Sequence, residues 1–414
     1  MKYRRLISGF LTFIVAALLL AACQARVQKT IDPTVVNFEA VYDADFNSVL
    51  YPSMMLALSN YQGSDMPELF TVSLTSPKNN SVVRIVVDST MLNYVSIMQE
   101  SLPKKGQRYT FTPVIKWKFD NLYRLRQPGL VDLTFTCYVN DEEVDVKTIR
   151  LNYRSINECL LSLIGKNGRY RDYRWLFTAY VNEDHPKIDN ILSEILDQGI
   201  VSVFDGDRTE KKVENQMRAI WYYALHRGIT YSTISCTSNK TSRSNSQYIR
   251  FFDDVYNNRQ ANCIDACVFF SSIMRRVGLQ PIIFVEPCHA YLGYYTDKSR
   301  KKIGLLETTI TGWVNLSELD KHYDVESGRL DDDSYNKIAR YLNDKDKARY
   351  QEGKMTLEEI KKSVSNTLFD RASEYQRESY EKNKALFADS TQMSYQQLVV
   401  SDLRKQVSPI PSAE

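Results

Sequence analysis

Residues that hold metals or cofactors are scarce in this sequence. The four histidines are spread along the chain, and none belongs to an H-E-x-x-H motif or to another local cluster. The seven cysteines form no C-x-x-C pair, which argues against structural zinc, and seven cysteines in 414 residues are too few for a disulfide framework. We therefore expect no metal and no cofactor.

An excess of charge of one sign is also missing. The chain has 53 Lys and Arg residues against 50 Asp and Glu residues, and three of the basic ones, Lys2, Arg4 and Arg5, lie at the N-terminus. Without them the charges balance, whereas a nucleic-acid-binding protein usually shows a clustered basic excess. Nucleic acid is therefore not an expected partner. The length predicts two or three domains, and a hydrophobic content of 43% is enough for a large core but too low for a polytopic membrane protein.

The N-terminal apolar run, residues 10–20, is too short to cross a bilayer, which takes about 20 apolar residues. Because it follows a basic segment, residues 1–22 are predicted to be a signal peptide. The run ends in Leu-Ala-Ala-Cys at residues 20–23, which resembles the lipobox of bacterial lipoproteins, where the cysteine is diacylated and becomes the mature N-terminus. Cys23 is thus the expected lipidation site and ties the chain to a membrane. The alternative is an ordinary signal peptide in which Cys23 is incidental.

The residues after Cys23 indicate which membrane of the envelope would hold the protein. Gln24 is not the aspartate associated with retention in the inner membrane, so we expect a lipid-anchored protein on the periplasm-facing side of the outer membrane. The cell surface is the alternative, although no acidic run after Cys23 argues for export to it. Residues 23–40 would then be a linker between the lipid anchor and the first domain.

Residues 41–155 are predicted to form a β domain. Apolar and polar residues alternate along 70–75, 115–119 and 131–139, as in strands with one buried face. About seven short strands in this span are typical of an immunoglobulin-like β-sandwich. Cys137 falls on the buried face, where we expect an inert thiol.

Beyond residue 155 apolar residues recur at helical spacing, which predicts an α+β domain over residues 156–345. Helices are expected around residues 188–196 and 213–225, each followed by a glycine. The Ser-, Thr- and Asn-rich residues 231–246 are expected to form an exposed loop.

Residues 346–414 are predicted to be a helical tail. Thr356 and Glu359 form a capping box, after which apolar residues follow one face of a helix. These residues are Leu357, Ile360, Val364, Leu368 and Ala372. The face is expected to pack on the preceding domain, and a helix that binds a partner is the alternative.

The residues that could carry out a reaction lie between 260 and 310. Asn262 is a good N-cap, and Asp265 three residues later supports it. Cys263 is therefore expected at the first position of a helix that ends at Gly278. At that position unpaired N–H groups and the helix dipole stabilise a thiolate. Cys267, one turn further along the apolar side, is expected to serve packing.

A predicted β-hairpin follows this helix. Its strands are His289 to Tyr295 and Ile303 to Thr308, and a hairpin centred on Lys298 places His289 opposite Glu307. The Cβ atoms of directly opposed antiparallel residues lie about 4.5–5.5 Å apart. A carboxylate at that distance fixes the tautomer of the imidazole, and the imidazole is the base that a nucleophilic thiol needs.

The order of these residues resembles that of the transglutaminase-like cysteine superfamily, whose papain-like arrangement has a cysteine at a helix start, a histidine on a strand and an acid on the next strand. Over about residues 170–345 the chain is similar to uncharacterised bacterial members of this superfamily. The motifs that carry the resemblance are Gln-Ala-Asn-Cys at 260–263, Arg-Val-Gly-Leu at 276–279, Pro-Cys-His-Ala at 287–290 and Leu-Glu-Thr-Thr at 306–309. Residues 403–404 and 409–411 also resemble the C-terminal end of those proteins.

The resemblance implies a role for each residue and a fold for the chain. Cys263 would be the nucleophile, His289 the general base and Glu307 the residue that orients the base. The expected fold is α+β, with an N-terminal immunoglobulin-like β-sandwich followed by a transglutaminase-like domain and a helical C-terminal tail.

The sequence departs from the family pattern at four positions. The acid is Glu307 rather than the commoner Asp, Cys288 stands where a glycine is usual, Tyr291 replaces a common tryptophan and Asn262 replaces a glycine. None of these changes removes a catalytic group. Cys288 places a second thiol near the site, so a reversible disulfide with Cys263 is one hypothesis, and a tolerated small residue is the other.

The function expected from these observations is acyl transfer in the bacterial envelope. Cys263 would attack the amide carbonyl of a peptide or protein through a thioester. Hydrolysis is favoured over cross-linking, because water is the default acceptor and cross-linking needs a site that excludes it. The competing hypothesis is a binding or scaffolding lipoprotein that keeps the fold without turnover.

Overall fold

The computed structural model describes residues 31–59, 68–204, 209–232 and 238–411. The described residues divide into two compact units: the first comprises 31–43, 68–118 and 131–151, and the second 44–59, 119–130 and the residues from 152 onward. Helices and strands both contribute, which confirms the α+β class. The predicted signal peptide, Cys23 and Cys236 lie outside the described residues. In the part of the chain that the structure describes, no helix is both long and apolar enough to cross a membrane.

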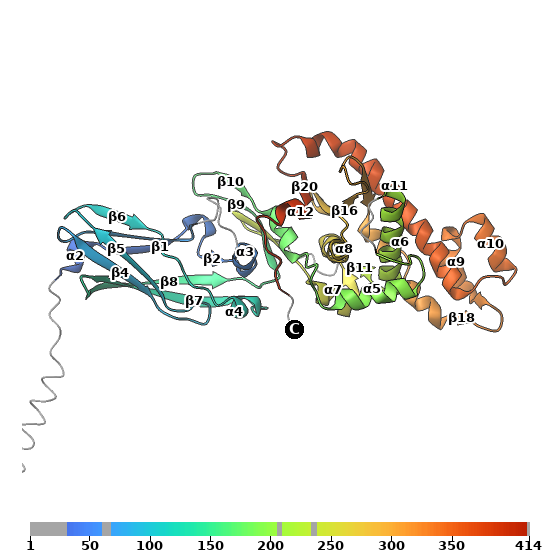
Figure 1. Ribbon diagram of the computed structural model, residues 1–414, viewed down its shortest axis with the longest axis horizontal. Coiled ribbons are helices and arrows are strands. Elements are labelled where there is room, and N and C mark those ends of the chain that lie inside the picture. The colour runs from blue at the N-terminus through green and yellow to red at the C-terminus, as the bar shows by residue number, and fades with distance from the viewer. Residues whose placement is uncertain (1–30, 60–67, 205–208, 233–237, 412–414) are drawn as a thin grey trace, which may run out of the picture. The chain divides into compact units, whose positions relative to one another are not determined.

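The first unit contains two antiparallel sheets, drawn in blue to green (Figure 1). One has the order β1-β3-β6, with bounds Glu39–Tyr42, Phe70–Thr75 and Arg108–Phe111. The other has the order β8-β7-β4-β5, with bounds Glu142–Tyr153, Gly129–Val139, Ser81–Val87 and Ser96–Leu102. The ring centres of Phe70 and Phe135 lie 5.8 Å apart, so the two sheets share one core. Cys137 is fully buried, as predicted, and burial raises the pKa of its thiol to about 12.

Two segments of the first 120 residues differ from the prediction. Residues 115–119 form no strand: Trp117 makes only an isolated bridge to Asn93, and helix α4 (Phe119–Tyr123) begins directly afterwards. Residues 31–40, placed by the sequence in a linker, contain the short helix α2 (Pro33–Val36) and the start of β1. The side chains of Ile31, Val36 and Phe38 are buried, and this stretch belongs to the first unit.

The second unit is built around a four-stranded antiparallel sheet with the order β17-β16-β15-β20. These strands are Ile303–Leu306, His289–Tyr295, Pro281–Glu286 and Gln396–Val399. Helix α8 (Cys263–Arg276) packs against β15 and β16, and the long helix α11 (Leu357–Ala388) packs against β17. The Trp221 ring of α6 contacts Phe270 of α8 and Phe369 of α11, with ring centres 6.0 and 6.1 Å apart. One aromatic core therefore holds the three helices together.

The remaining helices and strands of the second unit surround this core. The helices are α3 (Pro52–Ala57), α5 (Lys187–Asp197), α6 (Glu210–His226), α7 (Phe252–Asn258), α9 (Asp332–Ile338), α10 (Asp344–Gln351) and α12 (Val400–Leu403). A second sheet has the order β10-β9-β13-β12, with bounds Tyr170–Asp172, Glu158–Ile164, Ser244–Tyr248 and Ser238–Lys240. Short pairs are formed by β11 (Thr230–Tyr231) with β14 (Gln260–Ala261), by β18 (Tyr323–Asp324) with β19 (Arg329–Leu330), and by β2 (Val49–Leu50) with the end of β8.

The second sheet corrects one expectation. Residues 231–246 were expected to form an exposed loop, but β12 and most of β13 lie within them, and β13 pairs with the apolar strand β9. Ser246 is buried there. The polar composition did not indicate these strands, because their stability comes from pairing with a strand distant in the sequence rather than from their own side chains.

The C-terminal tail is helical, as predicted, but it also completes the central sheet. The capping box of Thr356 and Glu359 is present at the start of α11. Strand β20 pairs with β15, with Val399 opposite Ile282. The rings of Tyr380 and Phe387 on α11 lie 5.4 and 5.2 Å from that of Phe284 on β15, so α11 covers the face of the sheet on which Phe284 lies.

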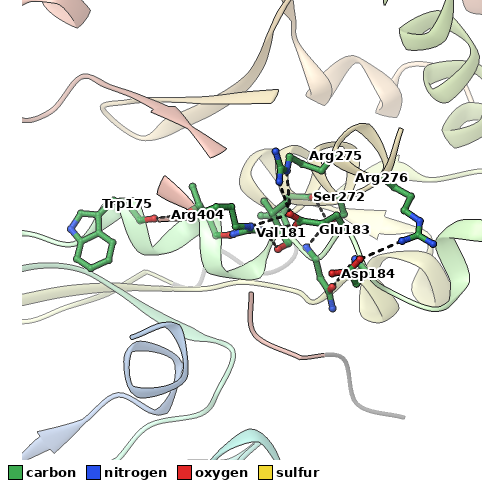
Figure 2. A network of polar contacts seen from close by, with 11 residues as sticks. Trp175, Val181, Glu183, Asp184, Ser272, Arg275, Arg276 and Arg404 are labelled. Carbon is green, nitrogen blue, oxygen red and sulfur yellow. Dashed lines mark hydrogen bonds and ion pairs between the residues drawn. The ribbon is translucent and has the colours of Figure 1, made fainter. Parts of the chain in front are cut away.

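A largely buried ionic network fixes the C-terminal segment to α8 (Figure 2). The Glu183 carboxylate accepts hydrogen bonds from Arg275 at 2.8 Å and from Arg404 at 2.7 Å. Arg404 also donates to the carbonyl oxygens of Thr178 and Val181. Burial favours the neutral form of Glu183, but the two guanidinium groups outweigh it and lower its pKa to about 2.

Candidate active site

Cys263 lies at the first residue of α8, as predicted. The Asn262 side chain accepts the N–H of Asp265 at 2.9 Å, and the Asp265 carboxylate accepts the N–H of Asn262 at 3.1 Å. Asp265 is buried and is paired with Arg250 at 2.7 Å. This reciprocal cap fixes the point at which the helix begins, and helix geometry leaves the Cys263 N–H without an intrahelical partner. Cys263 itself is half-buried.

His289 is placed by a tight hairpin. Strands β15 and β16 are joined by Pro287 and Cys288, and Glu286 pairs directly with His289 across the turn. Proline suits the first central position of such a turn, whereas the second position has φ near +63° at Cys288. The His289 side chain is 28% exposed, so a substrate can reach it.

Glu307 holds His289, although the predicted strand register was wrong. Leu292 pairs with Leu306, which centres the hairpin on Ser299 rather than Lys298, and β17 ends before Glu307. The residue instead caps a short 3-10 helix, Thr308–Gly312. One Glu307 carboxylate oxygen nevertheless lies 2.8 Å from His289 Nε2.

The other contacts of Glu307 make it a rigid, buried support. Its second carboxylate oxygen accepts the N–H of Thr309 at 2.9 Å, and its own N–H donates to the carbonyl of Ala372 on α11 at 3.1 Å. The side chain is 3% exposed. The carboxylate is therefore held from two sides, with one oxygen directed at the imidazole.

The electrostatics of the three groups are coupled. Burial lowers the pKa of His289, but hydrogen bonds with Cys263 and Glu307, and their negative charges, outweigh it and raise that pKa to about 10. Burial raises the pKa of Glu307, but its hydrogen bond and ion pair with His289 prevail and lower it. Because Glu307 occupies Nε2, the Nδ1 atom is left for the thiol. The raised pKa favours a cationic imidazole beside the Glu307 carboxylate.

Two other histidines also contact carboxylates, but without a thiol. His185 Nε2 lies 2.9 Å from Asp253, and His322 Nδ1 lies 2.7 Å from Asp331. His185 is buried against Phe252 and serves packing. A histidine–carboxylate pair is thus common in this chain, and the neighbouring Cys263 is what sets His289 apart.

The other described cysteines are poor candidates for the nucleophile. Cys159 and Cys267 are fully buried, and burial raises the pKa of each thiol well above its ordinary value. Cys267 therefore serves packing, as predicted. Cys288 is exposed at the hairpin turn. Within the described residues every cysteine is free, so Cys263 and Cys288 are not joined here.

Several residues that line the site were not found from the sequence. A cavity of about 410 Å³ opens beside His289 and Glu307, and its walls include Glu286, Trp313 and Gln376. Gln376 comes from α11, as do Tyr375 and Ser379. A signal was available, because the apolar stripe of α11 changes after Ala372 to Gln376, Ser379 and Asn383 at the same helical spacing.

Comparison with known proteins adds no relative. No protein-family model matches the chain, and a search of curated proteins finds no significant match. The transglutaminase-like resemblance therefore stays a prediction based on motifs. Within the ranges that the structure describes, no group of three or more His, Cys, Asp or Glu side chains is placed to hold a metal ion.

Proposed function

We propose that the chain is a lipid-anchored protein of the bacterial envelope, attached through Cys23 to the outer membrane and facing the periplasm. An immunoglobulin-like β-sandwich would precede a transglutaminase-like domain that hydrolyses a peptide or isopeptide bond of an envelope peptide or protein. The 2.8 Å contact of His289 with Glu307, and the effect of Cys263 on the pKa of His289, carry this proposal, because they bring together a nucleophile, a base and an orienting acid.

The reaction would proceed in two steps. Cys263 Sγ attacks the carbonyl carbon of the amide, the C–N bond breaks, and the imidazolium proton of His289 passes to the leaving amine. Water then attacks the thioester, His289 accepts its proton, and the C–S bond breaks to release the acid and the Cys263 thiolate. The Cys263 N–H at the start of α8 would donate to the oxyanion in both steps.

Glu307 would act on the base rather than on the substrate. Its carboxylate keeps a proton on Nε2, so that Nδ1 exchanges protons with the thiol and the substrate. Hydrolysis is favoured over cross-linking because His289 is open to water, and water is the most abundant acceptor in the periplasm.

The test is selective alkylation of Cys263 in the full-length chain. Iodoacetamide labelling at pH 7 is followed by peptide mass spectrometry, which separates Cys263 from the other thiols. We expect Cys263 to react faster than exposed Cys288, which lacks such a partner. His289→Ala should slow Cys263 at least about tenfold, whereas His185→Ala should not.

The opposite result would favour the competing hypothesis. If Cys263 reacts no faster than Cys288 and is unaffected by His289→Ala, the thiol is not activated. The chain would then be a binding or scaffolding lipoprotein that keeps the fold without turnover.

A further inference from the structure

The cavity beside His289 is bounded by three segments of the second unit. The β15–β16 hairpin supplies Glu286 and His289, the stretch after β17 supplies Trp313, and α11 supplies Gln376 and Ser379. A volume of about 410 Å³ lies within the range of small-molecule sites and accommodates one amino-acid side chain. The imidazole of His289 forms part of its wall, so an occupant would lie next to the proposed base.

The lining is acidic. Glu286 and His289 are direct partners in the hairpin, so their side chains project from the same face of the sheet. The Glu286 carboxylate accepts one hydrogen bond, from Asn383 Nδ2 at 3.2 Å, and no lysine or arginine of the described chain lies within ion-pair distance of it. Glu307 is already compensated by His289. Glu286 is therefore a carboxylate without a lysine or arginine partner.

Gln376 and Ser379 are two further polar residues of the lining. Gln376 is 1% exposed, and its Nε2 atom is buried beside the Tyr291 hydroxyl without a hydrogen-bond partner. The hydroxyl of Ser379 adds a further acceptor. No lysine or arginine is among the described residues that line this cavity.

Two exposed aromatic side chains complete the site. Trp313 is 51% exposed and Tyr375 is 60% exposed, and both line the cavity. The faces of large aromatic side chains attract cations. A larger cavity of about 790 Å³ on the other side of α11 differs, because Arg218, Lys302 and Arg377 are mixed there with carboxylates.

We propose that the cavity beside His289 is a subsite for a primary ammonium group, the end of a lysine-type side chain next to the amide that Cys263 attacks. Glu286 binds the ammonium group, the hydroxyl of Ser379 accepts one of its hydrogen bonds, and Trp313 and Tyr375 cover it. This subsite rests on the proposed function, because it defines the substrate as a peptide that carries a basic side chain beside the scissile bond.

Binding can be measured without the reaction. The full-length Cys263→Ala chain is titrated with Nα-acetyl-lysine amide and, separately, with the neutral isostere Nα-acetyl-6-hydroxynorleucine amide, by ligand-observed NMR. We expect the lysine probe to bind at least about tenfold more tightly than the hydroxyl probe. Glu286→Gln should abolish this preference, and Trp313→Leu should weaken the lysine probe about two- to fivefold.

A matched control separates a specific site from general attraction. Glu374→Gln removes the same charge from α11 on the side of the larger cavity and should leave both affinities within about twofold. Equal affinity for the two probes, or a lysine affinity that survives Glu286→Gln, would overturn the subsite. An unreactive Cys263 would instead overturn the proposed function while the binding preference persists, so the two failures are distinguishable.

Discussion

Glu307 contacts His289 Nε2 at 2.8 Å with one carboxylate oxygen and accepts the Thr309 N–H at 2.9 Å with the other. The carboxylate is buried, so neither contact is exchanged for water at little cost. The orientation of the imidazole therefore depends on Glu307, which contacts it at Nε2. This relationship gives the sharpest test of the catalytic arrangement.

Glu307→Gln should change the tautomer of His289, so that its proton moves from Nε2 to Nδ1. The amide keeps the size of the side chain and can still accept the Thr309 N–H, but its NH2 group would donate to Nε2. The imidazole would then hold its proton on Nδ1, where it can no longer accept one from the thiol. We expect Cys263 alkylation at pH 7 to slow at least about tenfold, while circular dichroism stays unchanged. A rate equal to that of the original chain would contradict the orienting role.

The pH dependence of stability should reflect His289. Because the pKa of His289 rises from 6.5 to about 10 on folding, the folded chain holds this proton more tightly than the unfolded chain. The stabilisation is fully present below pH 6.5 and is lost as the pH rises through 10. We expect His289→Gln to cost about 2 kcal/mol at pH 6 and clearly less at pH 10, measured by urea unfolding.

The Glu307 carboxylate of the same ion pair should affect stability at acidic pH. The pKa of Glu307 is lowered by His289, so its stabilisation is present above pH 4.5 and is lost as the pH falls below that value.

A difference between the His289→Gln and original chains that does not vary between pH 6 and pH 10 would show that the ion pair adds nothing to stability.

The local features of the site could be predicted from the sequence. The start of α8 follows from Asn262 and Asp265, whose reciprocal hydrogen bonds involve residues three apart. Strand β16 was also predicted with its bounds, because its apolar residues lie between turn-forming segments. These features are set by neighbours in the sequence, and a pattern of residue types is sufficient to find them.

The register of the hairpin was not predictable from polarity alone. In the turn after β16, the Asp297 carboxylate accepts the N–H groups of Lys301 and Lys302 at 3.0 and 2.9 Å, which fixes the shape of the connection. Several polar residues of that turn could have made such contacts. The predicted contact of His289 with Glu307 is present, but through the reach of the Glu side chain rather than through strand pairing.

The walls of the cavity could not be derived because they come together only in the folded chain. Gln376 follows Glu286 by 90 residues, and nothing near either residue in sequence indicates the other. The same holds for β20, whose pairing with β15 joins residues more than 110 positions apart. Contacts of this kind depend on tertiary packing, which periodicity in one segment does not encode.

Cys288 should be replaceable by glycine with a gain in stability. Its φ of about +63° lies in the left-handed region, where a side chain costs about 1 kcal/mol and glycine none. We expect Cys288→Gly to be more stable than Cys288→Ala by about 1 kcal/mol in urea unfolding. Equal stability of the two variants would mean that the turn relaxes without strain. Neither change removes a group of the site, so Cys263 alkylation should stay the same.

Arg404 should be the residue that attaches the C-terminal segment. It donates to Glu183 and to two backbone carbonyls, and it is largely buried, so its loss leaves acceptors without partners. We expect Arg404→Ala to lower the free energy of unfolding by about 3 kcal/mol. Arg300→Ala is the matched control, because its pair with Asp402 is in the same segment but exposed, and it should cost less than about 1 kcal/mol. Strand β20 lies just before Arg404 and pairs with β15, which leads through a tight turn to His289. The Arg404 variant should therefore also slow Cys263 alkylation, whereas the Arg300 variant should not. Similar losses in the two variants would show that the buried network holds the segment no more firmly than a surface ion pair.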